Sequence, residues 1–168
     1  LTSRCRLNTV EFKKPIKIGS VEIEFLRVTH SIPDSAAVAL HTPYGTIVHT
    51  GDFKFDLTPM NEPPADIQRL AELGEKGVLA IIADSTNATK PGNALSEKAI
   101  SGTLFNLMRE AKGRLVVSTF SSLLNRLAQV IEHAKTLNRK VFVSGRSMEQ
   151  NIEIAVELGY IQVPRGMI

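Results

Sequence analysis

The chain has 168 residues, of which 43% are hydrophobic and 22% charged, as in globular proteins and unlike disordered chains. Its 20 basic and 17 acidic residues give a net charge of +3, which mildly favours a polyanionic partner, although a solvated surface with a few extra lysines explains it as well. The single cysteine, Cys5, excludes an internal disulfide. Neither a membrane-spanning apolar run nor a signal peptide is present, so we expect a cytoplasmic protein.

The first half of the sequence predicts short strands. Apolar and β-branched residues alternate or run together, and turn signals such as Gly19-Ser20 and Pro43-Tyr44-Gly45 separate them. The predicted strands cover residues 8–12, 17–18, 21–28, 36–41 and 46–49. A short helix is expected at 67–73, ended by Gly74 and Gly77.

From residue 78 the pattern changes to alternating strand and helix. The apolar run at 78–83 predicts a strand covered on both faces, and further strands are expected at 114–118 and 141–143. Helices are expected at 97–111, with Ser96 as the N-cap, at 123–137, and at 148–158 before Gly159. This series predicts an α/β fold with a parallel, Rossmann-like sheet. We place a domain boundary near residues 90–93, giving domains at 1–92 and 93–168.

Three polar residues follow apolar strands at the point where each strand should end. His30 closes EIEFLRVTH, Asp52 closes TIVHTGD, and Asp84 closes VLAIIADST. Because strand ends on one edge of a sheet bring distant residues together, a histidine with two carboxylates is a candidate metal site. The alternative is structural: His30 and Asp52 would only hold turns. No local metal motif such as HExxH or CxxC decides between these interpretations.

Asp84 has two interpretations of its own. Its carboxylate could orient a metal-bound histidine. It could instead begin an Asx turn in Asp84-Ser85-Thr86-Asn87. Of the other histidines, His49 could support Asp52 or simply pack, His41 is expected to cap a strand end, and His133 is expected at the surface.

Two strand-to-helix connections carry hydroxyl and basic groups suited to phosphate. Backbone N–H groups at a helix N-terminus also favour an anion. Ordinary N-capping by Ser121 or Ser122 is the alternative, and the absence of GxxxxGK[ST] and GxGxxG leaves a nucleotide cofactor without support. The candidate substrate-binding residues are Ser118, Ser121, Ser122, Arg126 and Arg146.

Read in order, several segments resemble ribonuclease J, a branch of the metallo-β-lactamase fold nucleases that carry a β-CASP domain. The segments are Val28–Ser35 (VTHSIPDS), His49–Asp56 (HTGDFKFD), Ala83–Asn87 (ADSTN), Ser118–Phe120 (STF), Gly145–Glu149 (GRSME) and Glu157–Tyr160 (ELGY). Each segment is weak alone, whereas the ordered set is specific and covers nearly the whole chain.

The resemblance implies a part of a metallo-β-lactamase αββα sandwich followed by a Rossmann-like β-CASP segment. It implies that His30 and Asp52 are metal ligands, with Asp52 bridging, and that Asp84 is the acidic residue of the first β-CASP motif; Asp52 and Asp84 are the candidate catalytic residues. It further implies two zinc ions and an RNA hydrolase with 5′-to-3′ exonuclease and endonuclease activity in RNA maturation and messenger RNA decay. A homo-oligomer, dimer or tetramer, is expected for the full-length protein.

The departures from the family pattern limit this expectation. The family's His-x-His-x-Asp-His motif is absent, and Asn125 stands where family members often have histidine. We therefore expect an interior segment of a nuclease that is inactive alone, since zinc needs about four donors per ion. The alternatives are another metallo-β-lactamase hydrolase, and an RNA-binding or scaffold module without metal-dependent activity.

Overall fold

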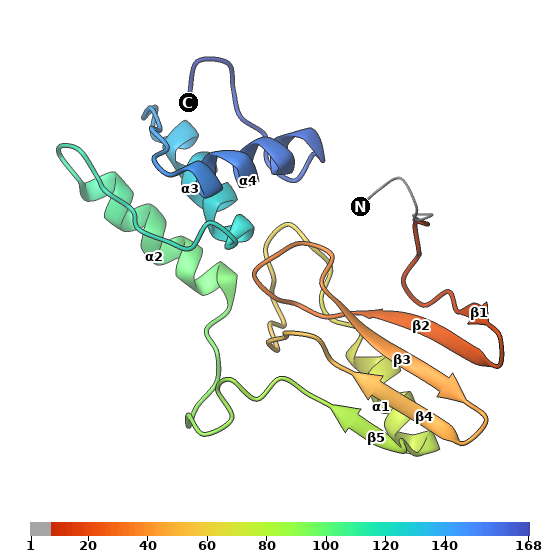
Figure 1. Cartoon of the computed structure of the whole chain (residues 1–168). Helices are drawn as coiled ribbons and strands as arrows, with labels where there is room; N and C mark the ends of the chain where they lie inside the picture. The colour runs from red at the N-terminus through yellow and green to blue at the C-terminus, as the bar shows by residue number, and fades with distance from the viewer. Residues whose placement is uncertain (1–7) are drawn as a thin grey trace. The chain divides into compact units, whose positions relative to one another are not determined.

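The computed structural model describes residues 8–168, so Cys5 lies outside the described residues. The chain divides into two compact units (Figure 1). The sheet unit comprises Leu1–Val28, Ser35–Lys54 and Ala65–Pro91, and the helical unit comprises Thr29–Asp34, Phe55–Pro64 and Gly92–Ile168. The predicted assignment of residues 1–92 and 93–168 to two different domains stays a prediction.

The sheet unit contains five strands in the spatial order β1-β2-β3-β4-β5. Neighbours from β1 to β4 are antiparallel, as short turns between consecutive strands require, whereas β5 pairs parallel to β4 after the α1 crossover. Residues 8–12, predicted as a strand, form none. The bounds are β1 Ile16–Ile18, β2 Val21–Arg27, β3 Ala36–Thr42, β4 Gly45–His49 and β5 Ala80–Ile82.

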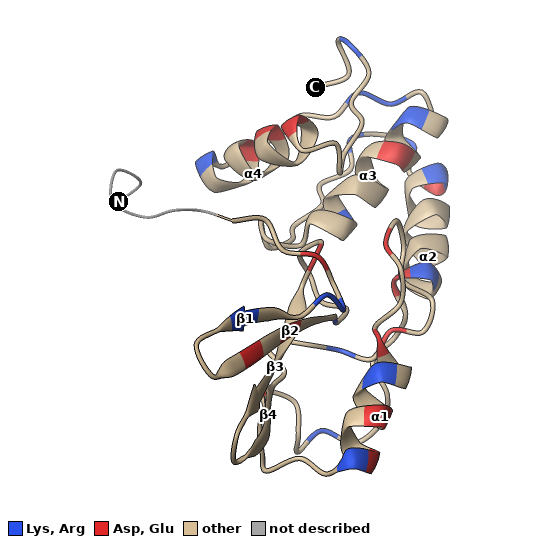
Figure 2. Ribbon diagram, turned by 90° about the vertical axis from the view of Figure 1, so that its right-hand side faces the viewer, with Lys and Arg blue, Asp and Glu red and all other residues tan. Residues whose placement is uncertain are grey.

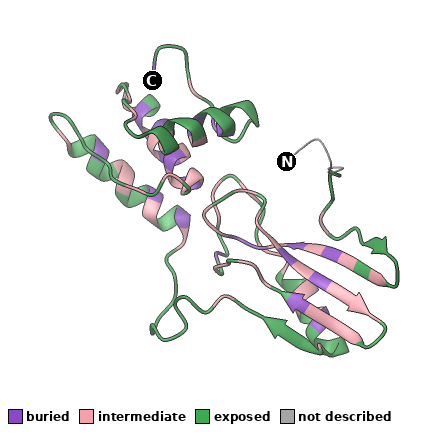
Figure 3. Cartoon of the chain, in the orientation of Figure 1, coloured by how far each residue is buried: buried purple, intermediate pink, exposed green. Residues whose placement is uncertain are grey.

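The core of the sheet unit lies between the sheet and helix α1 (Ile67–Lys76). Alternate residues of the strands face this core, and α1 adds Leu70 and Leu73; Figure 3 shows these buried positions along β2, β3 and β4. The predicted two-sided cover of the strand at 78–83 is wrong, because Ile81 and Ile82 of β5 are 65% and 56% exposed. The buried apolar residues of the strands are Leu26, Ala37, Ala39 and Val48, and the buried Val28 directly follows β2.

A buried carboxylate also faces α1. Glu24 of β2 is 2% exposed, and Arg69 of α1 binds it with two parallel bonds, Nε to Oε1 and NH2 to Oε2, each 2.9 Å long. The Nε2 of His41 lies 3.3 Å from Glu24 Oε2, and its Nδ1 lies 3.1 Å from Thr46 Oγ. His41 is therefore part of a buried ionic cluster rather than the strand-end cap predicted from sequence.

The helical unit is built on α2 (Glu97–Glu110), α3 (Leu124–Thr136) and α4 (Arg146–Glu157). Ser96 caps α2 as predicted, because its Oγ accepts a 3.2 Å hydrogen bond from the Ala99 N–H. His133 is half-buried and not at the surface as predicted: its Nε2 lies 3.0 Å from Ser101 Oγ, and its ring meets Phe105 edge-on. The buried apolar residues are Met108, Leu127, Ile131, Ala134, Ile152, Ala155, Ile161 and Met167.

The strands predicted at 114–118 and 141–143 do not form. Both segments lie outside any sheet in the described part of the chain, because apolar β-branched residues favour an extended strand but cannot supply its partner. Together with α3 and α4 they line a groove of about 840 Å³, in which Val116 and Phe142 are each 91% exposed. The α/β class is confirmed, whereas the predicted parallel sheet is not formed within the helical unit.

Charge does not mark helix α1 or helix α2 as basic or acidic. Figure 2 shows Lys or Arg beside Asp or Glu along both α1 and α2. The small net charge of +3 therefore does not indicate that α1 or α2 binds a polyanion. Among the described residues, no helix has the length and apolar character needed to cross a membrane.

Candidate functional site

Asp52 and Asp84 follow neighbouring parallel strands at the same edge of the sheet. β4 pairs with β5 in the register His49 to Ile82, and the ladder continues with a 3.0 Å bond from the Thr50 N–H to the Ile82 carbonyl. The Asp84 N–H then donates to Thr50 Oγ at 3.2 Å. The connection after β5 is thus anchored two residues before Asp52, and the sheet unit holds both carboxylates at one strand-end edge.

The turn at Gly51 determines the direction of the chain at Asp52. Gly51 has φ of +61°, and a Cβ built there would lie 3.0 Å from the Ala36 carbonyl oxygen, so both conformation and space favour glycine. The Gly51 N–H donates to His49 Nδ1 at 3.0 Å. His49 therefore supports the turn that presents the exposed Asp52.

Asp84 forms the turn that was the alternative to a catalytic role. Its Oδ1 accepts bonds from the Thr86 N–H at 2.8 Å and from the Thr86 hydroxyl at 2.6 Å. This is an Asx turn. A contact between this carboxylate and a metal-bound histidine stays a prediction.

His30 belongs to the helical unit, although it directly follows the strand region of the sheet unit. Its neighbour Thr29 is fully buried, and Thr29 Oγ accepts a 3.3 Å bond from the Asp56 N–H. His30 itself is half-buried. Because Asp52 lies in the sheet unit, the two predicted metal ligands stand in different units.

Asp56 is a functional candidate that sequence reasoning missed. It is 3% exposed, and its carboxylate accepts the Glu97 N–H on Oδ2 at 2.8 Å and the Thr58 N–H on Oδ1 at 3.0 Å. One side chain thus binds the first turn of α2, where a negative charge is favoured by the exposed N–H groups. Its partners lie 27 and 41 residues away, so the only sequence signal was its place in HTGDFKFD.

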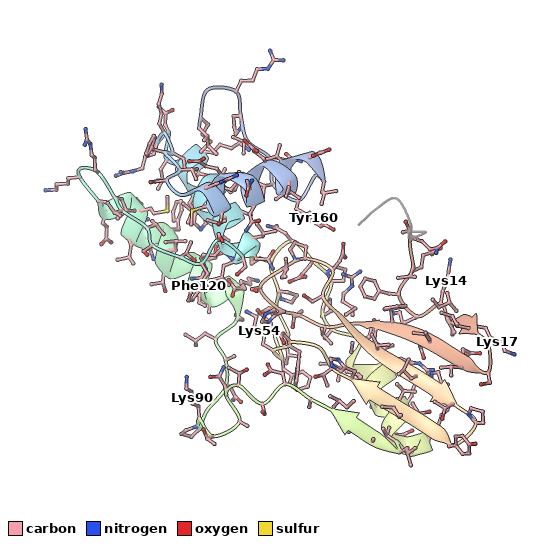
Figure 4. All side chains as sticks on the ribbon, in the orientation of Figure 1. Lys14, Lys17, Lys54, Lys90, Phe120 and Tyr160 are labelled. Carbon is pink, nitrogen blue, oxygen red and sulfur yellow. The ribbon has the colours of Figure 1, made fainter. Side chains whose placement is uncertain are left out.

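Two further contacts bind the loops of the helical unit to its helices. Asn125 Nδ2 at the start of α3 donates to Glu62 Oε1 at 3.0 Å, and the Tyr160 hydroxyl after α4 donates to Asp34 Oδ2. Figure 4 labels Tyr160 beyond α4 and Phe120 before α3. The loop that carries His30 and the loop at 55–64 are therefore both fixed to helices of this unit.

The structure gives the predicted phosphate-binding residues few of the contacts expected of an anion site. Neither Ser121 nor Ser122 caps α3, whose N-cap is Leu123 without a side-chain bond. Arg126 NH2 lies 3.2 Å from Glu97 Oε2, so its charge is partly neutralised, although its buried Nε has no hydrogen-bond partner. Ser118, Ser122 and Arg146 are exposed. Substrate contact by this set stays a prediction.

The residues present do not fit a two-metal centre without further donors. Within residues 8–168, no group of three or more His, Cys, Asp or Glu side chains could hold a metal ion. His30 and Asp52 provide two donors, whereas zinc takes about four per ion. The described residues therefore fall short of the donor set that a two-zinc centre needs.

Comparison with known proteins gives a consistent result. The family model "Ribonuclease J, beta-CASP domain" matches residues 112–168. Ribonuclease J of Helicobacter pylori strain 26695 is 49% identical over 161 residues, which are 96% of this chain and 23% of that protein. Ribonuclease J 2 of Staphylococcus aureus strain NCTC 8325 is 41% identical over 168 residues, the whole of this chain and 30% of that protein.

The chain is similar to ribonuclease J along nearly its whole length. The resemblance stated from the motifs is thereby confirmed. The chain spans 23% of the first of these relatives and 30% of the second, and the β-CASP family model matches from residue 112 onward.

The fold is also found among solved structures. A protein of unknown function from Enterococcus faecalis V583 superposes with a TM-score of 0.64 and 19% identity, covering 94% of this chain and 36% of that one. At this identity the likeness concerns the fold alone.

Proposed function

We propose that this chain is part of a ribonuclease that hydrolyses RNA phosphodiesters, with the 5′-to-3′ exonuclease and endonuclease activities expected of ribonuclease J. The observation that carries the proposal is the strand-end edge, where β4 and β5 hold Asp52 and Asp84 together. The similarity to ribonuclease J over nearly the whole chain supports the same reading. RNA maturation and messenger RNA decay in the cytoplasm, and a homo-oligomeric enzyme, belong to this proposal.

Zinc is the proposed cofactor, with His30 and Asp52 as two of its donors. Zinc would supply Lewis acidity at the phosphodiester. The chain's own residues prepare those donors: Thr29 and Asp56 fix the backbone beside His30, and Gly51 with His49 fixes the backbone beside Asp52. Because further donors must come from elsewhere, we expect these 168 residues alone to be inactive.

Substrate contacts are proposed at Ser118, Ser121, Ser122, Arg126 and Arg146. Their hydroxyl and guanidinium groups suit the phosphates of RNA. Arg126 is the least available of them, since it is paired with Glu97. An Arg146→Ala variant should therefore weaken RNA binding more than Arg126→Ala does.

The proposal is tested by RNA cleavage in the full-length protein. His30→Ala and Asp52→Ala should each lower the cleavage rate by a factor of about 100 or more, because ligand loss disables the centre. His133→Ala is the matched control, since the His133 ring contacts Ser101 and Phe105 of α2; it should keep the rate within a few-fold. Cleavage that survives in both ligand variants would exclude this site, and an intact protein that binds RNA without cleaving it would favour the scaffold alternative.

A further inference from the structure

Asp56 connects three segments of the helical unit. Its backbone N–H binds Thr29 Oγ at 3.3 Å, next to His30, and its carboxylate binds the backbone of Thr58 and of Glu97. Asp56 and Thr29 are 3% and 0% exposed, so these bonds form away from water. Loss of either partner would leave buried polar groups unpaired.

The connection continues into the next helix. Glu97, 7% exposed, accepts bonds on Oε2 from Arg126 NH2 and from Gln129 Nε2, each at 3.2 Å, and so holds α2 to α3. The backbone beside His30 is therefore joined through Asp56 and Glu97 to α3. Glu97 is thus the residue that links the Asp56 carboxylate to α3.

We infer that Asp56 is a positioning residue that sets the place of His30 against the β-CASP helices. This role rests on the proposed function. Asp56 acts through Thr29 and not on RNA, because its buried carboxylate accepts hydrogen bonds from two backbone N–H groups. A change at the Asp56 side chain keeps the backbone N–H that binds Thr29 Oγ, but it removes the carboxylate bonds that hold this backbone to Thr58 and to Glu97 of α2. The loop at 29–34 is then bound to a segment that is no longer fixed to α2. We then expect kcat to fall, because His30 is no longer held in its working position. Changes to residues that orient metal ligands lower activity in the same way.

The competing explanation is that Asp56 only stabilises the start of α2. The chain offers a matched control, because the Ser96 side chain caps the same helix through the Ala99 N–H. Ser96→Ala and Asp56→Ala each remove side-chain support from the first turn of α2. Only Asp56→Ala also releases Thr58 and frees from α2 the backbone segment that binds Thr29.

The experiment measures kcat and KM for RNA cleavage, thermal midpoints and amide hydrogen exchange in both variants of the full-length protein. We expect Asp56→Ala to lower kcat at least ten-fold with KM within two-fold, and to speed exchange at Glu97 and Thr58. Ser96→Ala should lower the thermal midpoint similarly yet keep kcat within two-fold. Asp56→Asn, which retains one acceptor oxygen, should recover part of kcat.

Two results would overturn the inference. Equal kcat in Asp56→Ala and Ser96→Ala would reduce Asp56 to a helix cap. A rise in KM with unchanged kcat would make it a substrate contact instead. If Asp56→Ala does not fold, Thr29→Val decides: it removes the acceptor and keeps the shape, and undiminished kcat there would overturn the inference. Failure of the proposed function is distinct, because the unsubstituted protein would then not cleave RNA.

Discussion

Single residues determine how the sheet edge presents Asp52. Gly51→Ala should lower the free energy of unfolding by about 2 kcal/mol, because alanine is strained at φ of +61° and its Cβ would lie 3.0 Å from the Ala36 carbonyl oxygen. Urea denaturation measures the change. The control is Gly74→Ala in α1, where φ is not positive and nothing lies within 4 Å; it should raise stability by about 1 kcal/mol. A similar change in the free energy of unfolding in both variants would contradict this account of the turn.

At this scale the sequence predicts the common strand-end edge of Asp52 and Asp84, but not the contacts of Asp56. The first two end apolar strands of recognisable pattern, so their common edge follows from strand pairing. Asp56 lies in an irregular loop, and its partners Thr29 and Glu97 become neighbours only through the tertiary fold. No local pattern encodes such contacts.

At the scale of elements, α1 is held to β2 by charge as well as by apolar packing. The hydrogen bonds from Arg69, helped by His41, hold the pKa of Glu24 below its ordinary value against the opposing effect of burial, and Glu24 in turn raises the pKa of Arg69. A carboxylate with a lowered pKa stabilises the fold above its unfolded pKa, and this stabilisation is lost as the pH falls through the folded pKa.

Glu24→Gln should therefore destabilise the chain by about 3 kcal/mol at pH 7, because it leaves the Arg69 charge without its buried partner. Chemical denaturation at pH 7 and pH 3 measures this, and the difference from the unsubstituted chain should shrink at pH 3. Glu72→Gln is the control, since Glu72 pairs with the same residue, through Arg69 NH1, but is 43% exposed; it should cost under 1 kcal/mol. A difference that does not change with pH would contradict an ionic role for Glu24.

Element prediction succeeded where one element's own residues suffice. Ser96 caps α2, and apolar spacing located α3 and α4, because helical hydrogen bonds are local. It failed at 114–118 and 141–143, because a strand needs a partner that its own sequence cannot name. His41 shows the same limit, since its role follows from Glu24 on the neighbouring strand.

At the scale of the whole molecule, the exposed apolar groove of the helical unit should be detectable by dye binding. The chain should bind an apolar fluorescent dye, and the double change Val116→Ser and Phe142→Ser should at least halve the signal, because both side chains line the groove and are 91% exposed. Tyr44→Ser is the control: Tyr44 is 89% exposed but lies in the turn between β3 and β4 of the sheet unit. An equal loss of signal in Tyr44→Ser would show that general exposure, not the groove, binds the dye.

The most direct test of the central claim is bound zinc and RNA cleavage measured on the same preparations of the full-length protein. About two zinc ions per chain, with both zinc content and cleavage reduced in His30→Ala and in Asp52→Ala, is the predicted result. Full zinc content and undiminished cleavage in both variants would contradict the account, and His30 and Asp52 would then serve only the turns that they form.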